Sequence, residues 1–171
     1  MKLANLLPLL LLAACTDNAT KQESVQIFAG ATTAMTSAQS RAVDQARGNH
    51  LNAPADLTLD YSGPCTLGGT VALSGDYTGD SAVDDRAAFD LKATFNGCHE
   101  LTGTLDGDLQ WTSVATGDSF TATMTGGLNW KGNDGEASCD FDLSLSVGTT
   151  GVSYDGHLCG YDVKTEIVLG H

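Results

Sequence analysis

Hydrophobic and polar residues alternate with a period of two along most of the chain after residue 56. Apolar or glycine residues occupy every second position for eleven residues in three separate runs, and shorter or weaker runs lie between and beside them. Such alternation predicts β-strands that bury one face. The eight predicted strands cover 57–61, 69–77, 89–95, 101–111, 120–130, 137–147, 151–158 and 161–169. Short connections rich in Gly, Asp, Thr and Ser separate them, which is typical of consecutive antiparallel hairpins.

The fit of side chains across neighbouring strands predicts their register. Residues opposite one another on the buried face must share the available space, so an inward glycine favours a large partner. The matches that achieve this are Phe95 with Leu101, Trp111 with Phe120, Trp130 with Ala137, and Val147 with Val152. We therefore expect a mainly β (α+β) fold, in which an antiparallel meander of about eight strands forms a barrel or half-barrel.

A different period precedes the strands, over 20–48. Residues recur there at steps of three and four, which predicts one face of a helix; they are Phe28, Ala31, Met35, Ala38, Ala42 and Ala46. Thr20 and Glu23 have the spacing of a capping box, and Gly48 is a suitable terminator. Because this face is mostly alanine, we expect the helix to lie close against the concave face of the sheet and to leave no sizeable cavity.

The first fourteen residues have the organisation of an export signal. Lys2 supplies a positive charge, and the twelve residues from 3 to 14 are apolar apart from Asn5. A stretch of twelve is too short to span a bilayer, which needs about 20 apolar residues. We therefore interpret 1–14 as a signal peptide that is removed, not as a retained membrane helix.

The residues at the end of this segment add a second feature. Leu12-Ala13-Ala14-Cys15 resembles the lipobox of bacterial lipoproteins. The resemblance implies cleavage before Cys15, a diacylglyceryl group on its thiol and an acyl chain such as palmitate on its amine. It also implies anchoring to a membrane through Cys15. Thr16, and not Asp, follows that cysteine, which favours the outer membrane over retention in the inner one, with the domain periplasmic or surface-facing.

The chain then divides into four parts. We expect a signal peptide at 1–14, a lipidated tether at 15–19, the helix at 20–48 and the β-meander at 56–171. The helix and the meander would form one globular unit.

Four cysteines follow the lipobox: Cys65, Cys98, Cys139 and Cys159. An even number in an exported chain favours two disulfides, with three connectivities possible. Zinc is the alternative, because His99 and His157 lie near cysteines, but Cys-x-x-Cys and His-x-x-x-His spacings are absent from the sequence. The predicted register brings all four cysteines to one end of the sheet and favours the local pairs, Cys65–Cys98 and Cys139–Cys159.

Charge and candidate chemistry narrow the function classes. The 171-residue chain has 8 Lys and Arg against 21 Asp and Glu, a formal charge of −13, which argues against binding to nucleic acid. Trp111 and Trp130 are expected at opposite ends of the sheet, as core residues and not as a ligand-stacking pair. Cys98-His99-Glu100 could combine a nucleophile with a base, but a disulfide would consume the thiol. We identify no catalytic residue, metal site or cofactor.

Three functions remain. The first is a non-catalytic, membrane-anchored lipoprotein with a disulfide-stabilised β-domain in a structural or binding role. The second is a carrier of a hydrophobic ligand, by analogy with lipocalins and lipoprotein carriers. The third is a hydrolase with an unrecognised site. An apolar interior left open by the helix would favour the carrier, and a perturbed histidine or carboxylate in a cleft would favour the enzyme. The partner, a protein or a hydrophobic ligand, is not identified by the sequence.

Overall fold

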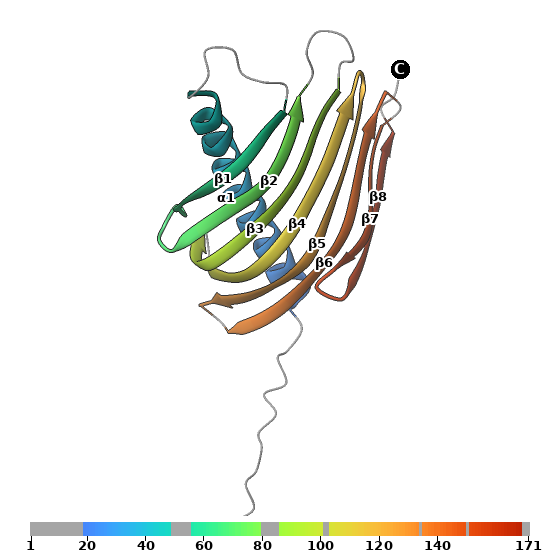
Figure 1. Cartoon of the computed structure of the whole chain (residues 1–171). Helices are drawn as coiled ribbons and strands as arrows, with labels where there is room; N and C mark the ends of the chain where they lie inside the picture. Colours follow the sequence, from blue (N-terminus) through green and yellow to red (C-terminus); the bar gives the residue numbers. More distant parts are fainter. Residues whose placement is uncertain are drawn as a thin grey trace, which may run out of the picture.

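A computed structural model describes residues 19–48, 56–79, 86–100, 103–133, 135–149 and 151–168. Within these residues the chain forms one helix and eight strands, as the sequence patterns predict (Figure 1). The elements are α1 (Lys21–Gly48), β1 (Asp56–Pro64), β2 (Thr70–Gly79), β3 (Arg86–Glu100), β4 (Gly103–Thr116), β5 (Ser119–Gly132), β6 (Glu136–Gly148), β7 (Gly151–Leu158) and β8 (Tyr161–Val168).

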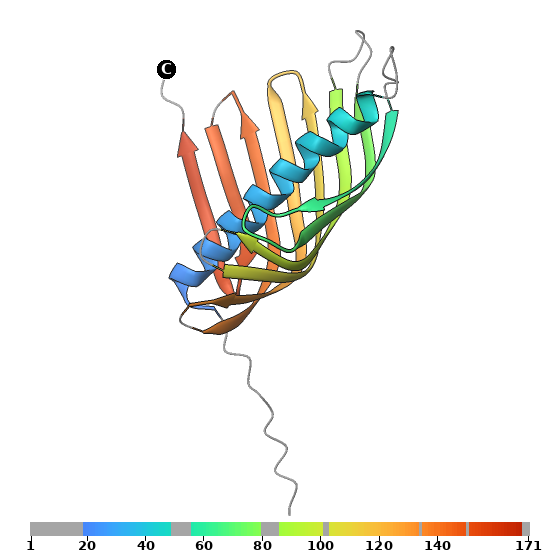
Figure 2. The same ribbon diagram turned by 90° about the vertical axis from the view of Figure 1, so that its left-hand side faces the viewer.

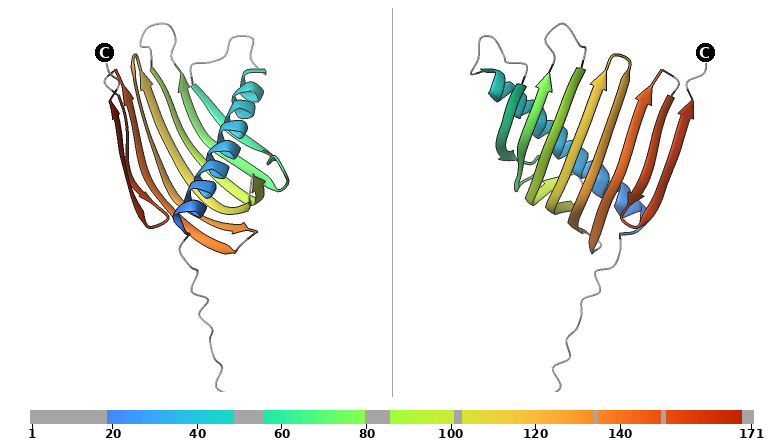
Figure 3. Two further views of the ribbon diagram at one scale, coloured as in Figure 1. Left: turned by 180° about the vertical axis from the view of Figure 1, so that it is seen from behind. Right: turned by 45° about the vertical axis from the view of Figure 1, so that its right-hand side comes forward.

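The eight strands form one curved antiparallel sheet. Their spatial order is the chain order, β1 to β8, so every strand pairs with its sequence neighbours. In the described residues β1 and β8 do not pair with each other, so the sheet is not closed into a barrel. Of the two expected forms, the closed barrel is therefore absent from the described residues, and the sheet is open and curved. Both views in Figure 3 show the sheet curving around α1, which lies on its concave face.

The helix crosses this face diagonally (Figure 2). We call the end of the sheet with the turns at 65–69 and 159–160 the cysteine end, and the end with the 117–118 turn the distal end. The first turn of α1 lies at the cysteine end of β8, where the Lys21 Nζ atom is 5.7 Å from the centre of the Tyr161 ring. Near its other end, Ala42 packs with Leu57 and Leu59 of β1. The helix therefore covers β1 to β4 more fully than the distal parts of β5 to β8.

Small side chains set the close approach of α1 to the sheet. Three of the four alanines of the predicted face are buried, with Ala31 fully inaccessible and Ala38 only 2% exposed, whereas Ala46 is half-buried. Ile27, which the periodicity did not single out, is also fully buried. The Thr32 and Thr33 hydroxyls donate to main-chain carbonyls one turn earlier, which satisfies them inside the helix. These contacts explain how residues of modest helix propensity are accommodated.

The predicted capping box is formed. The Thr20 N–H donates to Glu23 Oε2 at 2.7 Å, and the Glu23 N–H donates to Thr20 Oγ1 at 3.3 Å. Because the first N–H groups of a helix have no intrahelical acceptor, these two bonds stabilise its start. The bond from Thr20 also lowers the pKa of Glu23.

Replacing Thr20 by alanine should lower the free energy of unfolding by about 1 kcal/mol at pH 7. The contribution of Glu23 is present above the pKa that it has in the unfolded chain and is lost as the pH falls through its lower folded value. Urea unfolding of the parent and of Glu23→Gln should therefore differ at pH 7 and converge as the pH is lowered through the folded pKa of Glu23. A difference that does not change with pH would contradict the ionic part of this cap.

The predicted register is correct in half of the tested hairpins. Trp130 pairs with Ala137 and Val147 pairs with Val152, as expected. The other two matches are wrong. Met124, not Phe120, lies opposite Trp111, and Gly107, not Leu101, lies opposite Phe95.

Longer strands explain both errors. β4 continues beyond Trp111 to Thr116, and the inward residue that follows Trp111 is Ser113, a polar side chain that is nevertheless only 5% exposed. β3 likewise continues beyond Phe95 to Glu100, with a shift of register between Phe95 and Cys98. Slips by an even number of residues keep each side chain on its face, so alternation alone does not exclude them.

Inward glycines do lie beside large side chains. Gly126 has Leu109 on one neighbouring strand and Phe141 on the other. Its φ of 129° is one that other residues rarely adopt, and a Cβ atom there would overlap the Asp108 carbonyl oxygen. A side chain is therefore excluded at Gly126, and Leu109 and Phe141 supply the bulk beside it.

Candidate ligand-binding site

The lipobox and the proposed lipidation site, Cys15, lie outside the described residues. The same holds for the predicted signal peptide and for most of the tether. The described helix is too polar over its length to be a candidate for crossing a membrane. The anchor consequently remains an expectation from the sequence.

The four remaining cysteines form two disulfides, Cys65–Cys98 and Cys139–Cys159. The first joins the β1–β2 turn to β3 across 33 residues, and the second joins β6 to the β7–β8 turn across 20 residues. Both lie at the cysteine end of the sheet. Two disulfides suggest an oxidising, exported compartment.

The Cys98-His99-Glu100 sequence does not assemble a catalytic pair. Cys98 and Glu100 face the concave side and are buried, whereas His99 is exposed on the convex side. Ligand atoms of Cys65, Cys98 and Glu100 lie within 4.8 Å of one another. Because the two sulfurs are bonded to each other, neither offers a thiolate to a metal.

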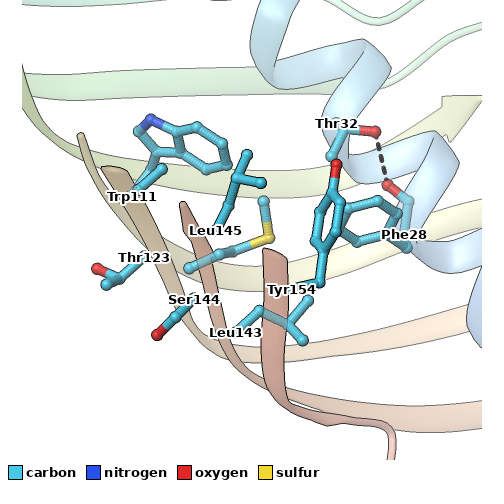
Figure 4. Close-up of a pocket in the computed structure, with 10 residues that line it drawn as sticks. Phe28, Thr32, Trp111, Thr123, Leu143, Ser144, Leu145 and Tyr154 are labelled. Carbon is cyan, nitrogen blue, oxygen red and sulfur yellow. Dashed lines mark hydrogen bonds between the residues drawn. The ribbon is translucent and has the colours of Figure 1, made fainter. Parts of the chain in front are cut away.

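A cavity opens where α1 leaves the concave face uncovered. We call it the trough; its volume is about 270 Å³, and it lies between the N-terminal half of α1 and strands β4 to β7 (Figure 4). Its walls are mainly apolar side chains, among them Phe28, Trp111, Met124, Leu143, Leu145 and Tyr154. The expectation of a core without a sizeable cavity is therefore wrong, because a diagonal helix cannot cover the whole width of the sheet.

Polar groups contribute little to the trough. Thr32 lines it, but its hydroxyl donates to the Phe28 carbonyl oxygen at 2.8 Å. The Thr123 and Ser144 side chains point away from the cavity (Figure 4). No charged residue is among those that line the trough, and the Tyr154 hydroxyl is one of its few polar groups. Such a lining suits an apolar molecule.

The apolar surface extends from the trough to the distal end. Residues in one row across four strands face the concave side there and are half-buried: Ala115, Phe120, Val147 and Val152. Figure 2 shows that α1 does not lie over the distal ends of β4 to β7. The trough is thus continuous with a larger apolar surface.

Shifted pKa values lie away from the trough. The pKa of Asp108 is lowered, first by the hydrogen bond that it accepts from Thr94 and then by the nearby Lys92. The hydrogen-bonded Lys131–Glu136 pair raises the pKa of Lys131 and lowers the pKa of Glu136. These groups are exposed on the surface and do not line the trough. Within the described residues, this pattern gives the hydrolase alternative no support.

Trp111 contributes to the trough, which the sequence pattern does not predict. Trp130 does not line the trough and is a core residue with 5% exposure, as expected. Trp111, however, is half-buried and forms a wall of the trough. Its period-two position predicts an inward side chain, but only the diagonal path of α1 determines whether the helix covers it.

No protein-family model, curated protein or solved structure matches this chain.

Proposed function

We propose that this protein is a lipid-anchored, exported module that binds an apolar ligand in the trough. The observation that supports this proposal is an uncharged, largely apolar cavity on the concave face that α1 leaves open. Soluble proteins rarely leave such surface exposed without a ligand or partner to cover it. A volume of about 270 Å³ is near the lower end for small-molecule sites, which favours a single acyl chain or a small ring system over a whole diacyl lipid.

The proposed location follows from the sequence. Lipidation at Cys15 would hold the domain at the outer membrane, and the two disulfides are compatible with that compartment. The open half-barrel would then act as a carrier or receptor for a hydrophobic molecule, not as an enzyme. A purely structural module, the competing interpretation, would leave the trough empty.

Ala122→Trp should weaken the binding of an apolar probe by about tenfold or more, because the indole would fill the cavity. Ala122 is 4% exposed and forms part of the trough wall. The probe is a fluorescent long-chain fatty acid, titrated into the full-length chain, and solvent extracts of the purified protein are examined by mass spectrometry for bound lipid. Thr121→Trp is the matched control, because Thr121 is exposed on the other face of the same strand.

Overpacking by tryptophan can also destabilise the fold. Leu145→Gln therefore provides a second variant, since Leu145 is half-buried on the trough wall and the change alters polarity with little change of size. Equal probe affinity in the parent, Ala122→Trp and Leu145→Gln would exclude the trough as the binding site. Absence of any probe binding and of any extracted lipid would favour the structural module.

A further inference from the structure

A second cavity lies on the other side of α1 from the trough and has a different chemical character. Its volume is about 310 Å³, and it is enclosed between the 34–41 stretch of α1, the end of β1 and the end of β3. Polar side chains form much of its wall, namely Ser37, Arg41, Tyr61, Thr66 and Glu100. The Cys65–Cys98 disulfide lies beside it, since Cys65 is part of the same wall. We call it the polar cavity.

Glu100 is the buried charged group of the polar cavity. It is 4% exposed, and its Oε1 accepts the Thr66 N–H at 2.7 Å. In the described residues, no Lys, Arg or His nitrogen lies within 4.0 Å of this carboxylate. One neutral N–H donor compensates only part of the cost of burying a carboxylate, so the site favours an additional cationic partner.

Arg41 lines the same cavity and is exposed at its edge. Its Nη1 is 3.5 Å from the Tyr61 hydroxyl oxygen, and in the described part of the chain no carboxylate lies within 4.0 Å of its guanidinium. A guanidinium with free donors is well suited to bind a carboxylate or phosphate group.

The two residues line the cavity from different elements, Glu100 from β3 and Arg41 from α1. Glu100 lies under the first half of α1, because a Cβ atom on Gly30 would be 3.6 Å from the Glu100 Cβ. Arg41 lies eleven residues later in α1, and its guanidinium is next to the Tyr61 hydroxyl, which lies beside Gly63 near the end of β1. Both residues line the same cavity and form no ion pair with each other, so a molecule inside it can contact both.

We propose that the polar cavity binds a small zwitterion, with its ammonium group against Glu100 and its anionic group against Arg41. Amino acids and the phosphoethanolamine group of lipids share this chemistry. The proposal is independent of the trough, because α1 separates the two cavities and they share no lining residue. A structural role for Glu100, in which it only holds the 65–69 turn through Thr66, predicts no ligand.

Calorimetric titration of the full-length chain tests the proposal with a series of probes of increasing charge separation. The zwitterions are glycine, β-alanine, γ-aminobutyrate and phosphoethanolamine, and the singly charged analogues are ethylamine and propionate. At least one zwitterion should bind, and about tenfold more tightly than either analogue, because each analogue loses one charged contact. The ligand would be identified as a lipid headgroup by two results together. Phosphoethanolamine would be the zwitterion that binds, and the Cys15→Ser chain would bind phosphatidylethanolamine vesicles in a way that depends on Glu100.

Glu100→Gln and Arg41→Gln should each weaken this binding by about tenfold or more. Glutamine at position 100 keeps an oxygen that can accept the Thr66 N–H, so the fold should be retained, and this is checked by the melting temperature. Arg86→Gln is the matched control, because Arg86 is exposed at the distal end of β3 and does not line the cavity. The proposal would be overturned if zwitterion binding were unchanged in Glu100→Gln, or if ethylamine bound as tightly as the zwitterions. It would also be overturned if no zwitterion gave heat at 10 mM, roughly the weakest affinity of interest.

Discussion

Replacing Cys15 by serine should move the protein from the membrane fraction to the soluble fraction. Two or three acyl chains give stable anchoring, whereas one chain gives only marginal binding. The described helix offers no alternative membrane span, and an acidic chain with a formal charge of −13 gains little from anionic headgroups. Removal of the acyl chains should therefore abolish nearly all membrane affinity, which is measured by fractionation and by the mass of the purified protein.

The control for this variant is Thr16→Ala, which leaves the cysteine and the three residues before it intact. It should stay acylated and membrane-bound. Membrane association of Cys15→Ser at the parental level would remove the lipoprotein interpretation. Acylation of Cys15 with inner-membrane fractionation would instead show that this chain follows a different sorting rule.

Replacing all four disulfide cysteines by alanine should unfold most of the protein at 37 °C. Chain-entropy estimates for loops closed across 33 and 20 residues are about 3–4 kcal/mol each. A domain of this size is stable by about 5–15 kcal/mol in total, so the loss of both bonds would remove much of that margin. The cysteines are at most 7% exposed, and their truncation also leaves small gaps in the core.

The two pairs can be separated experimentally. Cys65→Ala/Cys98→Ala and Cys139→Ala/Cys159→Ala should each lower the urea midpoint, with the first having the larger effect because it closes the longer loop. Non-reducing peptide maps of the parent should contain these two pairs and no other. A parental protein whose melting temperature is unaffected by dithiothreitol, after reduction is verified by mass, would contradict the stabilising role.

Local patterns in the sequence predict the elements and their faces well. Alternation at 120–130, for example, requires Met124 and Leu128 to lie on the same side of a strand, and both are buried. The capping spacing of Thr20 and Glu23 likewise involves only neighbouring residues. Such features depend on backbone geometry over a few residues, so they can be read without knowledge of the rest of the fold.

Features that depend on long-range packing could not be predicted in the same way. Ser113 interrupts the apolar pattern although its side chain is buried, so the pattern predicts an end of β4 that is too early. The trough depends on the angle at which α1 crosses the sheet, and the polar cavity depends on where Glu100 lies relative to that helix. Neither quantity is encoded in a periodic pattern, since each results from the packing of the whole layer.

The position of the first turn of α1 has a consequence for the orientation of the molecule on a membrane. This turn lies at the cysteine end, beside Tyr161. Residues 15–19 can span at most about 18 Å when fully extended. An anchor at Cys15 would consequently hold the cysteine end near the bilayer surface and direct the uncovered distal row, which includes Phe120 and Val147, away from it. A donor or acceptor of the apolar ligand would then approach from the aqueous side, and ligand exchange would be a collision between two surfaces, not a transfer within the anchoring bilayer.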